Sequence, residues 1–245
     1  AWSGVQQLAA QQALEFPPAV QAEMDAGAAY CRELQGRLEA KADEMLAKGR
    51  EQWDETEQRR ISAFVARALG KRTVYVNECA GLHYPFLPAD EFFDRRHFPW
   101  LEELEAATAD IREELHGLLA EGNPAIIPYV RLDEGTPENK WSELSHNDDW
   151  SACFLYEYGR PNQAVLDRCP RTAALLKRLP LAQIPGKAPN AFFSMLKPHS
   201  AIPPHTGVTN TRAIIHLALD VPPDCGFRVG GETREWVEGK AFAFD

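Results

Sequence analysis

The sequence has no long apolar run, no basic cluster and no paired-cysteine motif, and each absence excludes a class of protein. No apolar stretch approaches the ~18 residues of a membrane span, and the N-terminus lacks the basic-then-apolar pattern of a signal peptide. The net charge of −10 argues against a nucleic-acid partner, because phosphate contacts need clustered Lys and Arg. We therefore expect neither a membrane nor a nucleic acid among its partners.

The cysteines are too few and too scattered for a disulfide framework or a zinc site. There are five, with no CxxC pair: Cys31, Cys79, Cys153, Cys169 and Cys225. We expect reduced, mostly buried thiols that act as small core hydrophobes, and hence a reducing compartment, the cytoplasm. The chain also begins with alanine rather than methionine, so we expect the natural chain to start further upstream.

The first 70 residues predict a helical extension. A Gln/Ala-rich stretch over 1–16 is broken by Pro17-Pro18, since proline removes a backbone donor and clashes with the preceding turn. Apolar residues then recur every three or four positions to about Gly49, and a second helical stretch spans about 51–69 before Gly70. We expect residues 1–70 to be either a decoration packed on the main domain or the end of a helical repeat array.

Residues 71–245 predict a second domain, of α+β type. A Pro- and aromatic-rich irregular segment over 72–99 precedes one amphipathic helix, which runs from 101 to 118 and ends before Gly122. A loop and a short helix around 173–179 are expected within 162–180. Short β-rich or apolar runs lie at 125–131, 151–156, 191–196, 212–219, 226–229 and 241–244. Short strands after a helical half favour a barrel or jelly roll.

One stretch near the end of the sequence carries most of the candidate chemistry. Two prolines precede His205, and because each proline fixes φ, the imidazole is presented rigidly to a metal such as iron. Arg212, Ile214 and His216 alternate as on one face of a strand. An Arg and a His beside a metal ligand suit a dicarboxylate, because Arg can engage a carboxylate through two hydrogen bonds.

These segments together resemble the aspartyl/asparaginyl β-hydroxylase family, over about residues 72–245. The resemblance rests on Pro-Pro-His205-Thr-Gly-x-Thr-Asn-Thr-Arg212-x-x-x-His216-Leu, Cys225-Gly-Phe-Arg-Val-Gly-Gly-Glu232, Trp150-Ser-Ala and the closing Phe244-Asp245. It implies an Fe(II)- and 2-oxoglutarate-dependent dioxygenase with a double-stranded β-helix (jelly roll, cupin-like) core. It also implies hydroxylation of the β-carbon of an Asp or Asn side chain in a peptide.

The resemblance implies a role for each matched residue. His205 matches the first iron ligand and is the catalytic residue we expect. Ser194, His216 and Trp150 match contacts to 2-oxoglutarate, and Arg212 matches an arginine near the substrate carboxylate.

Two departures from the family pattern bear on the iron site and the cosubstrate. Gly207 stands where most 2-oxoglutarate oxygenases have Asp or Glu, which implies an iron site of two histidines. Ile214 stands where the best-known animal members have a second arginine. The second iron-binding histidine and the arginine for 2-oxoglutarate follow the Phe-Asp motif in the family, so we expect both beyond Asp245. The alternative is a truncated, catalytically inactive form, since residues 1–245 lack that second histidine.

Two other functions are compatible with the sequence. A double-stranded β-helix with a helical extension could bind a peptide without catalysis. Residues 141–150 do not match the substrate contacts of the animal enzymes, so a hydroxylase of a small molecule, such as a free amino acid or a lipid-linked group, stays open. The sequence alone leaves the substrate, the oligomeric state and the true termini undetermined.

Overall fold

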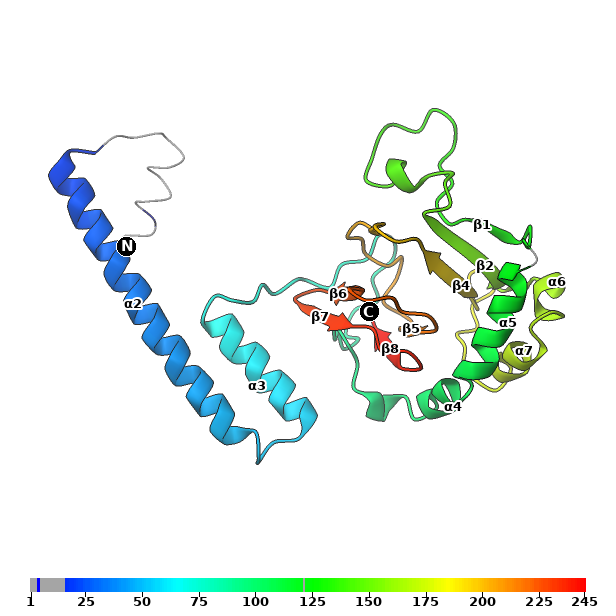
Figure 1. Cartoon of the computed structure of the whole chain (residues 1–245), viewed down its shortest axis with the longest axis horizontal. Helices are drawn as coiled ribbons and strands as arrows, with labels where there is room; N and C mark the ends of the chain where they lie inside the picture. The colour runs from blue at the N-terminus through cyan, green and yellow to red at the C-terminus, as the bar shows by residue number, and fades with distance from the viewer. Residues whose placement is uncertain (1–3, 5–15, 121) are drawn as a thin grey trace. The chain divides into compact units, whose positions relative to one another are not determined.

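The computed structural model describes residues 4, 16–120 and 122–245 (Figure 1). The chain divides into two units, residues 1–75 and 76–245, each of which is described by itself. Within the described residues, every helix is too short or too polar to span a bilayer. Apart from residues 4 and 16, the Gln/Ala-rich stretch lies outside the described part of the chain.

From residue 16 onward, the first unit contains a hairpin of two helices, α2 (Pro18–Gly49) and α3 (Glu55–Ala68). The side-chain amide of Gln35 on α2 donates a hydrogen bond to the carbonyl of Leu69, and Glu39 pairs with Lys71 at 2.9 Å. These contacts join the two helices. The apolar residues that predict α2 are nevertheless largely exposed, with Tyr30 at 60% and Met45 at 63%.

The ends of these helices follow from their capping residues. Pro18 lies in the first turn of α2, where a backbone N–H would have no partner in any case. Asp54 and Glu57 form a capping box, so α3 begins at Glu55 and not at about 51 as predicted. Gly70, with φ of +74°, ends α3 because glycine adopts positive φ without strain.

The second unit alternates short helices and strands. It contains η1 (Arg95–His97), α4 (Leu101–Ala106), α5 (Thr108–Ala120), β1 (Ile126–Pro128), η2 (Ser142–Leu144), β2 (Trp150–Glu157), β3 (Arg160–Pro161), α6 (Gln163–Leu166), α7 (Pro170–Leu176), β4 (Ala191–Leu196), β5 (Ile214–Leu217), β6 (Gly226–Val229), β7 (Glu232–Glu235) and β8 (Ala241–Phe244). Each of the six predicted β runs contains a strand.

Within the described residues, the strands β1–β8 pair antiparallel and form three sheets. β2 pairs with β1, β3 and β4, while β5 pairs with β8 and β6 with β7. The fold is therefore a mixture of helices and antiparallel sheets. The closure of these sheets into a double-stranded β-helix stays a prediction.

Some elements differ from those predicted. The helix expected over 101–118 is two helices, because the Thr108 hydroxyl donates to the Glu105 carbonyl at 2.6 Å and the chain turns at Ala107. α7 begins at Pro170, earlier than expected, and α6 was not predicted. β7 was also missed, since its sequence Glu-Thr-Arg-Glu has no apolar alternation.

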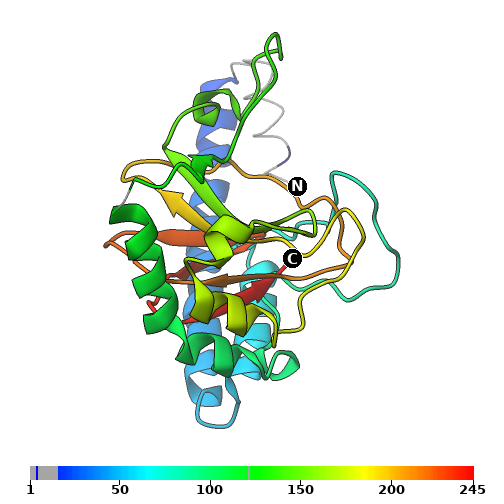
Figure 2. The same cartoon turned by 90° about the vertical axis from the view of Figure 1, so that its right-hand side faces the viewer.

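The helices cover one face of the four-stranded sheet and of the β5–β8 pair. Side chains of α4, α5 and α7 pack with Phe193 of β4 and Ala241 of β8 in the core, and Met195, Ile215 and Leu217 pack against it. Figures 1 and 2 show these helices beside the strands. Because successive side chains of a strand point to opposite faces, the residues between them point away from the helices. Ser194 on β4 and His216 on β5 are two such residues.

The expectation that most cysteines are buried was wrong. All five are free thiols, but only Cys153 and Cys169 are buried, while Cys31 is exposed on α2. Burial raises the pKa of the Cys169 thiol to about 11, which keeps it protonated. The cytoplasmic location stays a prediction.

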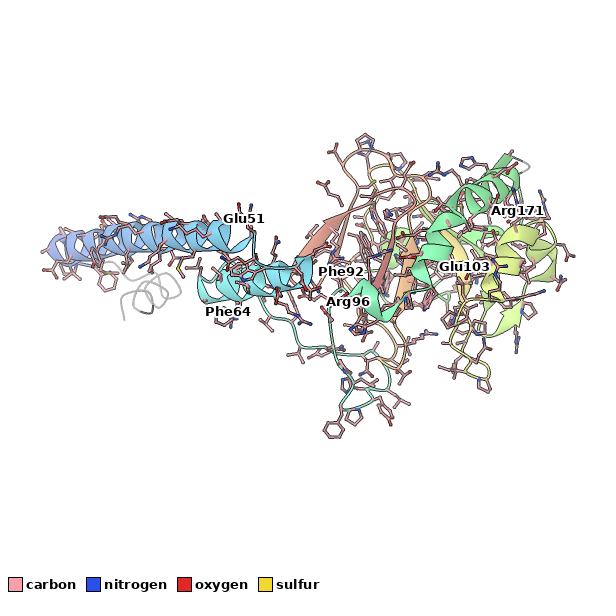
Figure 3. The ribbon with its side chains drawn as sticks, turned by 90° about the horizontal axis from the view of Figure 1, so that it is seen from below. Glu51, Phe64, Phe92, Arg96, Glu103 and Arg171 are labelled. Atoms are coloured by element: carbon pink, nitrogen blue, oxygen red, sulfur yellow. The ribbon has the colours of Figure 1, made fainter. Side chains whose placement is uncertain are left out.

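A buried carboxylate fastens α7 to α5. Glu114 on α5 is only 7% exposed and accepts hydrogen bonds from the backbone N–H groups of Arg171 and Thr172 and from the Thr172 hydroxyl. Arg171, labelled in Figure 3, adds a side-chain contact at 3.3 Å. Burial alone would raise the pKa of Glu114, but these hydrogen bonds outweigh it and hold the pKa below its ordinary value.

We expect Glu114→Ala to lower the free energy of unfolding by about 2–3 kcal/mol, because it leaves buried donors at the start of α7 without an acceptor. Urea denaturation measures the change. Glu113→Ala is the matched control, since Glu113 is an exposed partner of the same arginine, and it should cost less than about 0.5 kcal/mol. Equal effects of the two variants would contradict this account of Glu114.

Candidate functional site

The face of β2 and β4 that points away from the helices carries a tryptophan and a serine in contact. Trp150 is buried, and its indole N–H donates to the Ser194 hydroxyl oxygen at 3.0 Å. Ser194 pairs with Ala152 across the two strands, which fixes this geometry. Since the indole can only donate, the serine oxygen accepts, and the serine proton remains available for another acceptor such as a carboxylate.

His205 lies on an exposed loop between β4 and β5, and one of its ring nitrogens is already engaged. Nδ1 lies 2.8 Å from the carbonyl oxygen of Pro203. A carbonyl has no proton to give, so Nδ1 carries a proton, and in the neutral imidazole Nε2 then has the lone pair. Metal-binding histidines have this arrangement, with the second nitrogen donating to a carbonyl or carboxylate. The imidazole therefore fits one ligand position of an Fe(II) site.

An aromatic row connects His205 to the Trp150–Ser194 pair. The Trp141 ring meets the His205 ring edge-on at 5.1 Å and lies 6.2 Å from the Trp150 ring at an interplanar angle of 28°. Trp150 also stacks on Tyr129 at 4.0 Å. The structure thus brings three predicted site residues, at 150, 194 and 205, into one chain of contacts.

Sequence reasoning missed Trp141 and Tyr129. Tyr129 directly follows β1 and its backbone N–H donates to the Trp150 carbonyl, so strand pairing places it next to Trp150. Trp141 lies in the loop between β1 and β2, and no helical or strand periodicity relates it to Trp150. Trp141 could have been identified from the sequence as an isolated tryptophan in a polar loop, because it is unfavourable to expose so large an apolar side chain to water.

His216 lies on β5 among rings of its own sheet and of the segment 226–236. It packs against Phe227 of β6, Phe244 of β8 and Trp236, with ring centroids 4.8–5.9 Å away. Burial lowers the pKa of its imidazole to about 4. His216 is therefore neutral at pH 7 and can offer a carboxylate a hydrogen bond, but no positive charge.

Arg212 does not lie on the strand where the alternating pattern placed it, since β5 begins only at Ile214. The prediction was wrong because the Thr-Asn-Thr segment before Arg212 is held in a turn by the Thr209 hydroxyl, which accepts from the Thr211 N–H. The guanidinium charge of Arg212 still affects the pKa of Tyr129. Burial raises the pKa of that phenol, and the positive charge of Arg212 works in the opposite direction.

The described residues include no cluster of three or more His, Cys, Asp or Glu side chains that could hold a metal ion. His205 therefore contributes a single nitrogen from this part of the chain. Two surface hollows, of about 640 and 600 Å³, lie elsewhere: one is lined by residues of the β2–β3 hairpin, the other by residues of the loop between β1 and β2. None of the predicted site residues lines either hollow.

The chain matches the family model for aspartyl/asparaginyl beta-hydroxylase over residues 105–245, which include every predicted site residue. Mouse aspartyl/asparaginyl beta-hydroxylase is 36% identical over 111 residues, or 44% of this chain and 14% of the mouse protein. The ornithine lipid ester-linked acyl 2-hydroxylase of Rhizobium tropici is 30% identical over 172 residues, or 69% of this chain and 57% of that protein. Human aspartate beta-hydroxylase domain-containing protein 2 is 36% identical over 164 residues, 66% of this chain and 42% of the relative. The matched regions thus span only part of these relatives.

The half-buried His216 predicts a specific dependence of stability on pH. Its folded-state pKa of about 4 lies below the unfolded value of 6.5, so between these values the unfolded chain binds the proton more readily. Stability should therefore fall as the pH drops through this window, by up to about 1.4 kcal/mol per pH unit from this group.

In His216→Phe we expect a smaller loss of stability between pH 6.5 and 4.5 than in the parent, measured by urea denaturation at each pH. Glu105 and Glu114, whose pKa values are also lowered, contribute equally to both proteins. His199→Gln changes an exposed histidine and should keep the parental pH dependence. An unchanged pH dependence in His216→Phe would contradict the lowered pKa of His216.

Proposed function

Because the chain belongs to the aspartyl/asparaginyl β-hydroxylase family, we propose that it is an Fe(II)- and 2-oxoglutarate-dependent dioxygenase that hydroxylates a β-carbon. The observation that carries the proposal is the state of His205. Its Nδ1 is occupied by the Pro203 carbonyl, its Nε2 is open, and an aromatic row connects it to the Trp150–Ser194 pair. This combines a metal-binding nitrogen with a donor for a carboxylate.

The chain's own residues would bind and orient the reactants. His205 would hold the metal through Nε2, and the Ser194 hydroxyl, which accepts from Trp150, would donate its own proton to a carboxylate of 2-oxoglutarate. When bound, the metal and cosubstrate supply the oxidation: O2 and 2-oxoglutarate become succinate and CO2, with one oxygen atom inserted into a substrate C–H bond. His216, neutral and enclosed by rings, would offer the cosubstrate one further hydrogen bond and keep water away.

We propose an Asp or Asn side chain in a peptide as the substrate. Arg212 has no ion-pair partner among the described residues, and its charge is felt at Tyr129 beside Trp150. A free guanidinium next to the site suits the carboxylate of a substrate, which it can bind through two hydrogen bonds.

A second candidate substrate is an acyl chain, as in a lipid-linked molecule. Ile214 replaces the arginine of the best-known animal members and is 40% exposed, on the same face of β5 as His216. Leu196, next to Trp150 across β2 and β4, is 46% exposed. These apolar side chains would contact a hydrocarbon better than a charged peptide. The relative from Rhizobium tropici, named as an acyl 2-hydroxylase, matches 69% of the chain.

The reaction can be tested by succinate release from the full-length protein, with Asp- and Asn-containing peptides in one series and acylated amino acids in another. We expect His205→Ala to lower turnover at least about 100-fold, because the metal loses a ligand. His199→Ala, a nearby exposed histidine, should leave turnover unchanged. Undiminished turnover in His205→Ala would exclude the iron role, and 2-oxoglutarate binding without turnover on any substrate would favour the non-catalytic peptide-binding module.

Ser194→Ala should raise the dissociation constant for 2-oxoglutarate about 10- to 100-fold, because a hydrogen bond to a carboxylate contributes about 1.5–3 kcal/mol. Isothermal titration of the metal-loaded protein measures this change. Ser200→Ala, on the following loop, serves as the control and should bind as the parent does. Equal affinities in all three proteins would remove Ser194 from the cosubstrate site.

A further inference from the structure

The loop of residues 131–149, between β1 and β2, is fastened at its base. Val130 and Ser145 form a parallel bridge, and the His146 N–H donates to the Val130 carbonyl at 2.9 Å. Two more bonds join Leu132 to the returning segment: its N–H donates to the Ser145 hydroxyl at 3.0 Å, and its carbonyl accepts from the His146 ring at 2.8 Å. Figure 1 draws this loop in green beyond β1 and β2.

The far part of the loop is also ordered by its own hydrogen bonds. The Asn139 side chain accepts from the Trp141 N–H at 2.9 Å, and the Asn139 N–H donates to the Ser142 hydroxyl at 2.9 Å. The turn of η2 that follows buries Leu144. The loop's own hydrogen bonds therefore restrain the backbone at Lys140 and Trp141, independently of the contacts of these residues with other segments.

Both of these residues contact the segment that carries His205. The Lys140 ammonium donates to the Pro204 carbonyl at 2.8 Å, and the Trp141 ring meets the His205 ring edge-on at 5.1 Å. Trp141 also lies beside Trp150. The loop thus reaches the histidine from the side on which the Trp150–Ser194 pair lies.

The other side of the same segment is held by residues 80–84. The N–H groups of Ala80 and Gly81 donate to the carbonyls of Gly207 and Val208 at 2.8 and 3.0 Å. The buried side chain of Asn210 bonds to both the N–H and the carbonyl of Tyr84. His205 is exposed, yet its backbone is restrained on both sides.

We infer that Lys140 and Trp141 are positioning residues for the metal ligand His205, an assignment that rests on the proposed function. An exposed imidazole on a free loop would sample many rotamers, and binding a metal would then cost the entropy of ordering it. The hydrogen bond from the Lys140 ammonium to the Pro204 carbonyl and the edge-on contact between the Trp141 and His205 rings restrict the imidazole before a metal binds. Partners of this kind, outside the metal's own ligands, typically change metal affinity by about 10–100-fold.

Mn(II) binding to the full-length protein, followed by electron paramagnetic resonance without turnover, tests this inference. We expect Trp141→Ala to raise the dissociation constant for Mn(II) about tenfold and Lys140→Met to raise it about threefold, with unchanged melting temperatures. Lys187→Met is the matched control, an exposed lysine away from the loop, and should bind Mn(II) as the parent does. If Trp141→Ala does not fold, Lys140→Met decides, because its side chain is exposed.

The results separate this inference from the proposed function. Parental Mn(II) affinity in His205→Ala would overturn the proposed function itself. Loss of Mn(II) binding in His205→Ala, with parental affinity in Trp141→Ala and Lys140→Met, would overturn only the positioning role.

Discussion

The packing of α4, α5 and α7 against one face of the strands is the constraint on which the site depends. Phe193 and Met195 of β4, and Ile215 and Leu217 of β5, belong to that apolar layer or pack against it. Strand side chains alternate, so burial of these residues directs Ser194 to the opposite face. A shift of one residue in the β2–β4 register would turn Ser194 into the apolar core and break its bond to Trp150.

The two histidines in the family segment acquire different properties from their surroundings. His205 is exposed on a loop, where a proline carbonyl selects its tautomer and leaves a nitrogen for a metal. His216 is enclosed by rings, and the loss of water keeps it neutral. A protonated His216 would have no carboxylate among its aromatic neighbours, so the free-energy cost of removing the charge from water keeps the imidazole neutral.

Aromatic contacts connect segments that are distant in sequence. Tyr129 after β1, Trp141 in the loop and Trp150 on β2 form one row that ends at His205. Such rings bury a large area with few rotatable bonds, so they hold a loop in place with little loss of entropy. The helical first unit presents the opposite case, since much of its apolar stripe, including Phe64 of α3 in Figure 3, is exposed.

The sequence by itself determined the family, the positions of most helices and strands, and His205 and Ser194 as site candidates. Apolar periodicity is a local property, and the Pro-Pro-His segment is a fixed spacing along the chain. The tertiary structure decided what depends on distant neighbours: the start of β5 after Arg212, the neutral state of His216, and the contacts of Tyr129 and Trp141. The state of His216 and the contacts of Tyr129 and Trp141 arise from atoms that packing brings together from distant segments, and neither composition nor periodicity carries that information. The late start of β5 follows from the hydrogen bond between Thr209 and Thr211, which apolar periodicity does not report.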